Sequence, residues 1–169
     1  MRWEDGEQGG NIEDRRGLRP RMPRGGGGVG IGAPGDFTKA YVIAHEVGHH
    51  VQKVLGTAAK VQSTQRSASS RAQANRYSVA LELQADCYAG VWAANAPAAS
   101  RGAIGIDRRD FEDGLRAANA IGDDTLQKCA QGRVMPDSFT HGSSAQRVQW
   151  LRHGFDTGDP ALCNTFASL

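Results

Sequence analysis

The chain has 169 residues, a formal net charge of +2 and only 7% aromatic residues, with 22 glycines. This length suits one domain and excludes two, and the nearly balanced charge gives no general case for a nucleic-acid-binding protein. No run of about 18 apolar residues is present, so the sequence contains no candidate membrane-spanning helix.

The first 35 residues are rich in glycine, arginine, proline and acidic residues. A segment of this composition buries too little apolar surface to fold, so residues 1–35 are expected to form a disordered leader and residues 36–169 one folded domain. The arginines of the leader lack the interleaved aromatic residues that a nucleic-acid-binding segment would carry. No nucleic-acid partner is therefore expected.

The first predicted helix begins at Asp36, which can cap it, and ends near Gly56. Its apolar residues recur at steps of three and four, the period of one helix face; they are Phe37, Tyr41, Val42, Val47, Val51 and Leu55. In the middle of this helix stands His45-Glu46-Val47-Gly48-His49, the H-E-x-x-H pattern of zinc hydrolases.

Residues four positions apart share one helix face, so His45 and His49 are predicted to present two imidazoles to one Zn²⁺ ion. Glu46 is placed to take a proton from water at the metal rather than to bind the metal. His50 points about 100° away around the helix and is not expected to be a ligand. The alternative is that both histidines are ordinary packed or surface residues of an amphipathic helix.

Residues 57–70 are rich in Ser, Gln and Ala with little apolar periodicity, so a poorly packed helix end or a mobile loop is expected there. A long helix is predicted from Arg71 to Asn95, ended by Pro97. Catalytic zinc usually takes three protein ligands and leaves the fourth position to water, and this second helix is where the third ligand is sought.

Glu82 and Asp86 lie one turn apart on one face of the second helix. Glu82 is the predicted third zinc ligand, and Asp86 is predicted to accept a hydrogen bond from the distal N–H of His45, which strengthens that histidine as a ligand. The alternative is a solvated acidic helix face. The apolar neighbours of both acids argue against it, because buried unpaired carboxylates are costly.

Two further helices are predicted downstream. Ile106, Asp107 and Phe111 supply an apolar residue, an Asp cap and a second apolar residue, a hydrophobic staple that opens a third helix ending near residue 122. Ser143 and Gln146 form a capping box that opens the fourth helix.

His141 precedes the fourth helix and Arg147 lies within it. A histidine or arginine near a zinc site can stabilise the oxyanion that forms when water adds to a peptide carbonyl, and we assign this role to His141 first and Arg147 second. An equally weighted alternative is that His141 belongs to the helix cap and Arg147 forms an ion pair with an acid such as Asp86.

The three cysteines, Cys87, Cys129 and Cys163, show no C-x-x-C spacing, so neither a thiolate zinc site nor a redox motif is expected. Cys87 is predicted to be a buried small apolar residue. Cys129 and Cys163 lie in loop-rich surroundings and could form a disulfide in an oxidising compartment.

Three stretches together resemble the bacterial neutral zinc metallopeptidase family, the YpfJ-like proteins; they are residues 40–52, 82–90 and 140–147. The resemblance runs from about Gly32 to the C-terminus. It implies a zincin-like fold in which His45, His49 and Glu82 bind zinc, as in gluzincin-type relatives. It also implies that Glu46 is the general base and that Asp86 supports a ligand.

The leader resembles the same family, in residues 1–3, 11–16 and the glycine run 25–32. Family members continue from this run into a membrane-spanning helix and a further region before the zinc helix, whereas here Gly32 passes directly to Ala33-Pro34-Gly35. The relatives are thus implied to be membrane-anchored with an extracytoplasmic peptidase domain. This chain, without anchor or signal peptide, is expected in the cytoplasm.

The sequence therefore predicts a mainly α fold: a zincin-like core made of the H-E-x-x-H helix, the Glu-bearing helix and two further helices. The predicted function is a Zn²⁺-dependent metallopeptidase acting on a peptide or protein substrate. Peptidases of this type commonly align substrate on an edge strand before the zinc helix, and that region is missing here. The alternative is therefore a non-catalytic zinc-binding remnant. No oligomeric state is predicted.

Overall fold

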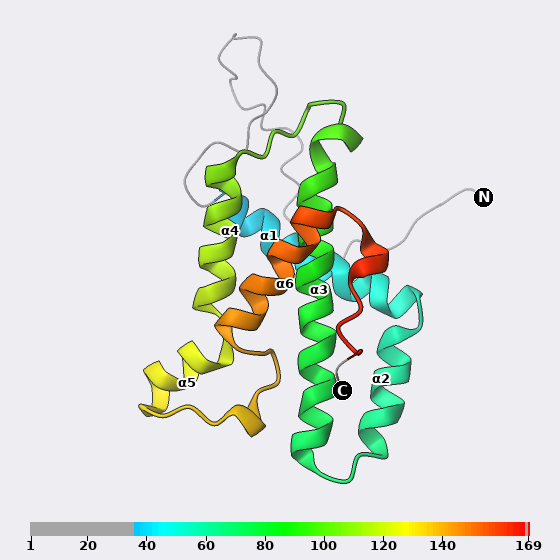
Figure 1. Cartoon of the computed structure of the whole chain (residues 1–169), viewed down its shortest axis with the longest axis vertical. Coiled ribbons are helices and arrows are strands. Elements are labelled where there is room, and N and C mark those ends of the chain that lie inside the picture. The colour runs from blue at the N-terminus through cyan, green and yellow to red at the C-terminus, as the bar shows by residue number, and fades with distance from the viewer. Residues whose placement is uncertain (1–35, 168) are drawn as a thin grey trace, which may run out of the picture.

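The computed structural model describes residues 36–167 and 169, which contain six α-helices, two short 3₁₀ helices and no strand. The helices are α1 (Asp36–Val54), α2 (Thr57–Arg66), α3 (Arg71–Ala99), α4 (Arg108–Ala120), α5 (Asp123–Gln131) and α6 (Ser144–Thr157), with η1 (Pro136–Ser138) and η2 (Pro160–Leu162) (Figure 1). The predicted mainly α fold is confirmed. The expected disordered leader, residues 1–35, lies outside the described residues.

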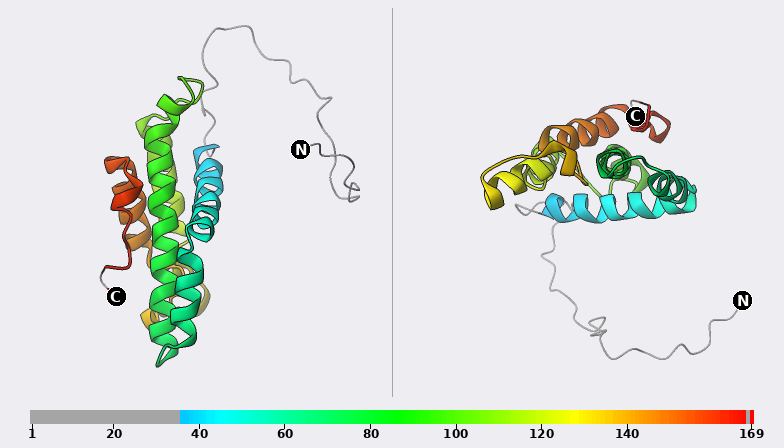
Figure 2. Two further views of the ribbon diagram at one scale, coloured as in Figure 1. Left: turned by 90° about the vertical axis from the view of Figure 1, so that its right-hand side faces the viewer. Right: turned by 90° about the horizontal axis from the view of Figure 1, so that it is seen from below.

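The 29-residue helix α3 runs the length of the molecule, with α1 on one side of it and α6 on the other (Figure 2). The α3–α6 crossing is close because glycines meet main chain there. A Cβ on Gly154 would collide with the carbonyl group of Cys87, and one on Gly90 would collide with the main chain of α6. This contact holds the residues of α6 against the middle of α3.

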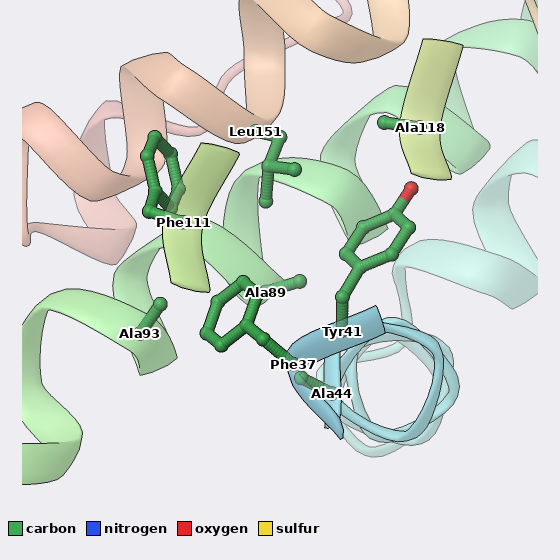
Figure 3. Packing of buried hydrophobic residues seen from close by; sticks show 8 residues of the cluster. All are labelled: Phe37, Tyr41, Ala44, Ala89, Ala93, Phe111, Ala118 and Leu151. Carbon is green, nitrogen blue, oxygen red and sulfur yellow. The ribbon is translucent and has the colours of Figure 1, made fainter. Parts of the chain in front are cut away.

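One apolar cluster joins α1, α3, α4 and α6, and its buried members are Phe37, Tyr41, Ala44, Ala89, Ala93, Phe111, Ala118 and Leu151 (Figure 3). Most α3 members are alanines, so the aromatic rings of α1 and α4 supply the bulk that fills the space between helices. Burial of rings of this size is the main source of stability for a core with so few large residues. The cluster holds the N-terminal half of α1 in place.

The predicted helix starts at Asp107 and Ser143 are confirmed. The Asp107 side chain accepts the main-chain N–H of Asp110 at 2.9 Å, and Asp110 returns a bond to the N–H of Asp107. Ser143 and Gln146 form the same reciprocal pair at the start of α6. Each capping box satisfies N–H groups that have no partner within the helix.

Two helix predictions were wrong. Residues 57–66, expected as a helix end or loop, form α2, because Val61 is buried and the Gln65 amide donates to Ala74 O and Ser78 Oγ of α3. Helix α3 also continues past Pro97 to Ala99. A proline so close to the helix end removes a single hydrogen bond, which the remaining turn tolerates. Helix α5 is an additional element that the sequence pattern did not indicate.

The predicted cysteine arrangement was also wrong. Cys87 is fully buried as expected, but it forms a disulfide with Cys163, and Cys129 is free and exposed. The bond ties the C-terminal tail to the middle of α3. Such bonds persist in oxidising compartments and are rare in the cytosol.

The outer face of α1 remains uncovered in the described part of the chain. Ile43, Val47 and Leu55 are 64%, 54% and 63% exposed, and they line an apolar groove beside α3 that also contains Trp92 and Pro160. Among the described residues, no helix combines the length and apolar character needed to cross a bilayer.

Candidate metal centre

Helices α1 and α3 pack closely at Gly48, one of the two free positions of the H-E-x-x-H pattern. A Cβ on Gly48 would lie 3.1 Å from both the Cα and the carbonyl oxygen of Ala85. The absence of a side chain therefore allows the two helix backbones to pack against each other. This packing brings the histidines of α1 within reach of Glu82 on α3.

Three potential ligand atoms converge at this crossing. Nε2 of His45 lies 3.2 Å from Glu82 Oε2, Nε2 of His49 lies 3.4 Å from Glu82 Oε1, and the two Nε2 atoms are 3.1 Å apart. A tetrahedral zinc ion with ligands at 2.0–2.1 Å separates its ligand atoms by about 3.3 Å. Each of these three distances is close to that spacing, with the two histidines facing different oxygens of the Glu82 carboxylate, so the three side chains are placed to share one zinc ion.

The hydrogen bonds behind the histidines select the nitrogen atoms that face the centre. Nδ1 of His45 lies 2.8 Å from Asp86 Oδ1, and Nδ1 of His49 lies 2.9 Å from Gln52 Oε1. Both oxygens can only accept, so both Nδ1 atoms carry the proton and both Nε2 atoms present a lone pair when the rings are neutral. Hydrogen-bond acceptors of three residues then face one another with no N–H or O–H group among them, and such a group of lone pairs fits a metal cation.

In the metal-free chain, protons provide the missing positive charge. Burial alone would lower the pKa of His45, but its hydrogen bonds with Asp86 and Glu82 raise that pKa to about 9. The pKa of His49 is raised chiefly by its contact with Glu82. Burial would raise the pKa of Glu82, but the two histidines outweigh it and hold that pKa well below its usual value. A metal at this centre must displace a proton.

Asp86 is fully buried and forms a charged pair with Arg147. The Arg147 guanidinium donates to Oδ2 at 2.9 Å and to Oδ1 at 3.0 Å, and the Tyr41 hydroxyl donates to Oδ1 at 2.6 Å. The Arg147 guanidinium lies 3.5 Å from His45 Nδ1, whereas Asp86 Oδ1 lies 2.8 Å from the same nitrogen. Burial would lower the pKa of Arg147, but Asp86 raises it, so the guanidinium stays charged. Of the two readings of Arg147, the ion pair with Asp86 is the contact observed.

His141 stands beside the centre on the loop before α6. Its Nδ1 lies 3.0 Å from Thr140 Oγ1 and 3.3 Å from Asp123 Oδ1, while about half of the side chain is exposed. Asp123 Oδ2 also accepts the main-chain N–H groups of Thr140, His141 and Gly142 at 2.7, 2.7 and 3.2 Å. One carboxylate thus holds the whole loop in position.

The convergent atoms open into a pocket of about 250 Å³, lined by Tyr41, Val42, His45, Glu46, His49, Glu82, Ile121, His141 and Arg147. Glu46 is exposed on this wall and is not one of the three residues whose potential ligand atoms lie together. Every site residue proposed from the sequence lines the pocket except Asp86, which lies behind His45. His50 is exposed and does not line it.

Sequence reasoning missed three residues of this centre. Tyr41 was assigned to the apolar face of α1, Asp123 was given no role, and Gln52 was not considered. Gln52 follows His49 by three positions, so helical spacing alone could have placed it beside that histidine. The contacts of Tyr41 and Asp123 join distant parts of the chain and leave no local signal.

Comparison with known proteins gives a family and two groups of relatives. A family model described as "Putative neutral zinc metallopeptidase" matches residues 29–166. The chain is 57% identical over 136 residues to uncharacterized protein YpfJ of Escherichia coli K12, covering 80% of this chain and 46% of that protein. It is 43% identical over 140 residues to uncharacterized protein Rv2575 of Mycobacterium tuberculosis H37Rv, covering 79% and 46%. The chain spans less than half the length of these relatives. No solved structure matches it.

Proposed function

Because the chain belongs to the zinc metallopeptidase family whose model it matches, we propose that it is a zinc-dependent endopeptidase of the gluzincin type. The observation that supports this most is the convergence of His45, His49 and Glu82: the two Nε2 atoms are 3.1 Å apart, and they lie 3.2 and 3.4 Å from the two carboxylate oxygens. These three residues would hold the zinc ion. A bound zinc ion supplies Lewis acidity, which polarises a substrate carbonyl and lowers the pKa of water.

Glu46 is the proposed general base. It follows His45 directly on α1 and projects from the wall of the pocket without belonging to the group of potential ligands. A carboxylate in this position can accept a proton from water and return it to the leaving amine. General acid–base catalysis of this kind typically contributes about 10²- to 10⁴-fold in rate.

His141 is the proposed donor to the oxyanion. Its loop is anchored by Asp123, and Nδ1 faces Thr140 and Asp123, which leaves Nε2 as the ring nitrogen without a hydrogen-bond partner among the described residues. Arg147 is already engaged on both oxygens of Asp86, so its part is to hold Asp86 against His45. We further propose that residues 36–169 act as one domain, since a single apolar cluster joins α1, α3, α4 and α6.

A second candidate is a zinc-binding domain without peptidase activity. The observation that favours it is that the described residues contain no strand on which a substrate peptide could be aligned by strand addition. In this case the metal contributes to folding only, as in structural zinc sites.

Zinc content and peptide hydrolysis of the purified chain, measured with Glu46→Gln and His50→Ala, distinguish the candidates. The endopeptidase predicts bound zinc in all three proteins and hydrolysis lost by about 10²-fold or more in Glu46→Gln alone. Bound zinc without hydrolysis in any of them supports the non-catalytic domain. A wild-type chain that binds no zinc contradicts both.

A further inference from the structure

The two histidines of the centre are held by different kinds of group. His45 contacts a carboxylate, whereas His49 contacts the neutral amide of Gln52. Gln52 is only 1% exposed, so its partners are protein atoms rather than solvent. Its Nε2 donates to the carbonyl oxygen of Leu81 at 2.7 Å and to Oε1 of Gln84 at 3.1 Å. The oxygen of this buried amide thus pairs with His49, and its NH₂ group has two acceptors.

These partners determine the orientation of the Gln52 amide. Leu81 O and Gln84 Oε1 are both acceptors, so an amide turned by 180° would set its own oxygen against two other oxygens. Oε1 must then face the ring of His49, where it can only accept a hydrogen bond. The proton of a neutral His49 therefore sits on Nδ1, and Nε2 points its lone pair toward His45 and Glu82.

The orientation of Gln84 is determined in the same way one step further out. Its Nε2 donates to the carbonyl oxygen of Cys163 at 2.9 Å, which leaves Oε1 facing Gln52. That carbonyl belongs to the C-terminal tail, which is tied to α3 by the Cys87–Cys163 disulfide and by a 2.6 Å hydrogen bond from Thr165 Oγ1 to Ala80 O. The sequence of bonds thus ends at an anchored main-chain atom.

We propose that Gln52 is a positioning residue for His49, and that Gln84 and the anchored carbonyl of Cys163 complete a relay that selects Nε2 of His49 as the metal-binding nitrogen. The inference rests on the proposed function, because it requires His49 to be a ligand. It assigns the C-terminal tail a part in metal binding although no tail residue faces the pocket. Partners that orient a metal-binding histidine typically change metal affinity by about 10- to 100-fold.

The test measures the zinc affinity of the full chain by competition with a chromogenic chelator. Gln52→Met keeps the length of the side chain without its hydrogen bonds, and we expect zinc binding about 10- to 100-fold weaker. Gln131→Met, at an exposed glutamine of α5, is the matched control and should bind zinc as wild type does. The absorption spectrum of the Co²⁺-loaded proteins gives a second readout, since it reports ligand geometry.

Wild-type affinity and spectrum in Gln52→Met would overturn the relay. A loss of zinc affinity in Gln52→Met without a change in the Co²⁺ spectrum would also overturn it, because the loss would then not come from the geometry of the ligands. If Gln52→Met does not fold, Gln84→Met repeats the test one bond further from the ligand, with an expected loss of at least about threefold; unchanged affinity there has the same meaning. A wild-type chain without zinc affinity contradicts the proposed function and the relay together, whereas zinc binding that ignores Gln52 and Gln84 contradicts the relay alone.

Discussion

Replacing Asp86 by asparagine removes the negative charge between His45 and Arg147. Asp86 is fully buried and Arg147 is 3% exposed, so the substitution leaves a guanidinium without a counter-ion inside the protein. Loss of one partner of a buried ion pair typically costs about 3–5 kcal/mol. Domains of this size have only about 5–15 kcal/mol of stability, so most of it can be lost. The same change replaces the charged acceptor of His45 by a neutral amide and turns one acceptor atom near Arg147 into a donor, so it should weaken zinc binding by about 10- to 100-fold.

The double variant Asp86→Leu with Arg147→Met separates these two effects. Replacing both partners by apolar side chains is often neutral for stability, so the unfolding free energy of the metal-free double variant should lie within about 1 kcal/mol of the wild-type value. Its zinc affinity should be at least as weak as that of Asp86→Asn, because leucine offers His45 no acceptor at all. Urea denaturation in EDTA gives the free energy of unfolding, and chelator competition gives the affinity.

Asp137→Asn serves as the control, since Asp137 is exposed and forms no ion pair among the described residues. Its unfolding free energy should stay within about 0.5 kcal/mol of wild type. The reasoning is refuted if Asp86→Asn loses less than about 1 kcal/mol and binds zinc as tightly as wild type. It is refuted in part if the double variant regains zinc affinity, because His45 would then need no acceptor.

Three other predictions concern pH, the helix crossing and the disulfide. The folded-state pKa of His45, about 9, exceeds its ordinary 6.5, so its contribution to the stability of the metal-free chain is complete below pH 6.5 and is lost as the pH rises through 9. Urea denaturation in EDTA across this pH range measures the loss, and a flat stability profile would contradict the prediction. Excess zinc should abolish the loss. Gly48→Ala should lower the unfolding free energy by about 1–3 kcal/mol and weaken zinc binding, because the added methyl group forces α1 away from α3. Gly105→Ala, where a Cβ meets no atom within 4 Å, should change neither quantity. Equal thermal unfolding of the two variants would show that the crossing tolerates a methyl group. Cys163→Ser should lower the unfolding free energy by about 2–5 kcal/mol, because it opens a disulfide that spans 76 residues. Cys129→Ser, at the free and exposed cysteine, should leave stability unchanged. Equal unfolding midpoints of the two variants would mean that the disulfide does not stabilise the chain.

Local spacing along the chain was sufficient for much of the fold and for part of the candidate site. Residues four apart on a helix share a face, so His45 and His49 were expected side by side, and the structure places them so. The caps at Asp107 and Ser143 involve residues only three positions away, and both helix starts were predicted correctly. Such features depend on the helix alone and need no knowledge of what packs against it.

Contacts between distant segments do not follow from local spacing. Glu82 and Asp86 were expected beside the histidines only because a zinc site needs a third ligand and a partner for its histidine, and the ion pair of Arg147 with Asp86 was one of two alternatives. The pairing of Arg147 with Asp86 spans 61 residues, the relay from His49 reaches the C-terminal tail, and the disulfide joins Cys87 to Cys163 rather than Cys129 to Cys163. Each depends on how α1 and α6 pack on the two sides of α3, which is decided by close main-chain approach at small residues. Helical periodicity determines which side chains share a face, whereas only the packed helices determine which faces meet. For that reason the sequence alone indicated the candidate ligands and Asp86 behind His45, whereas the tertiary structure decided that Gln52, Tyr41 and Arg147 complete their surroundings.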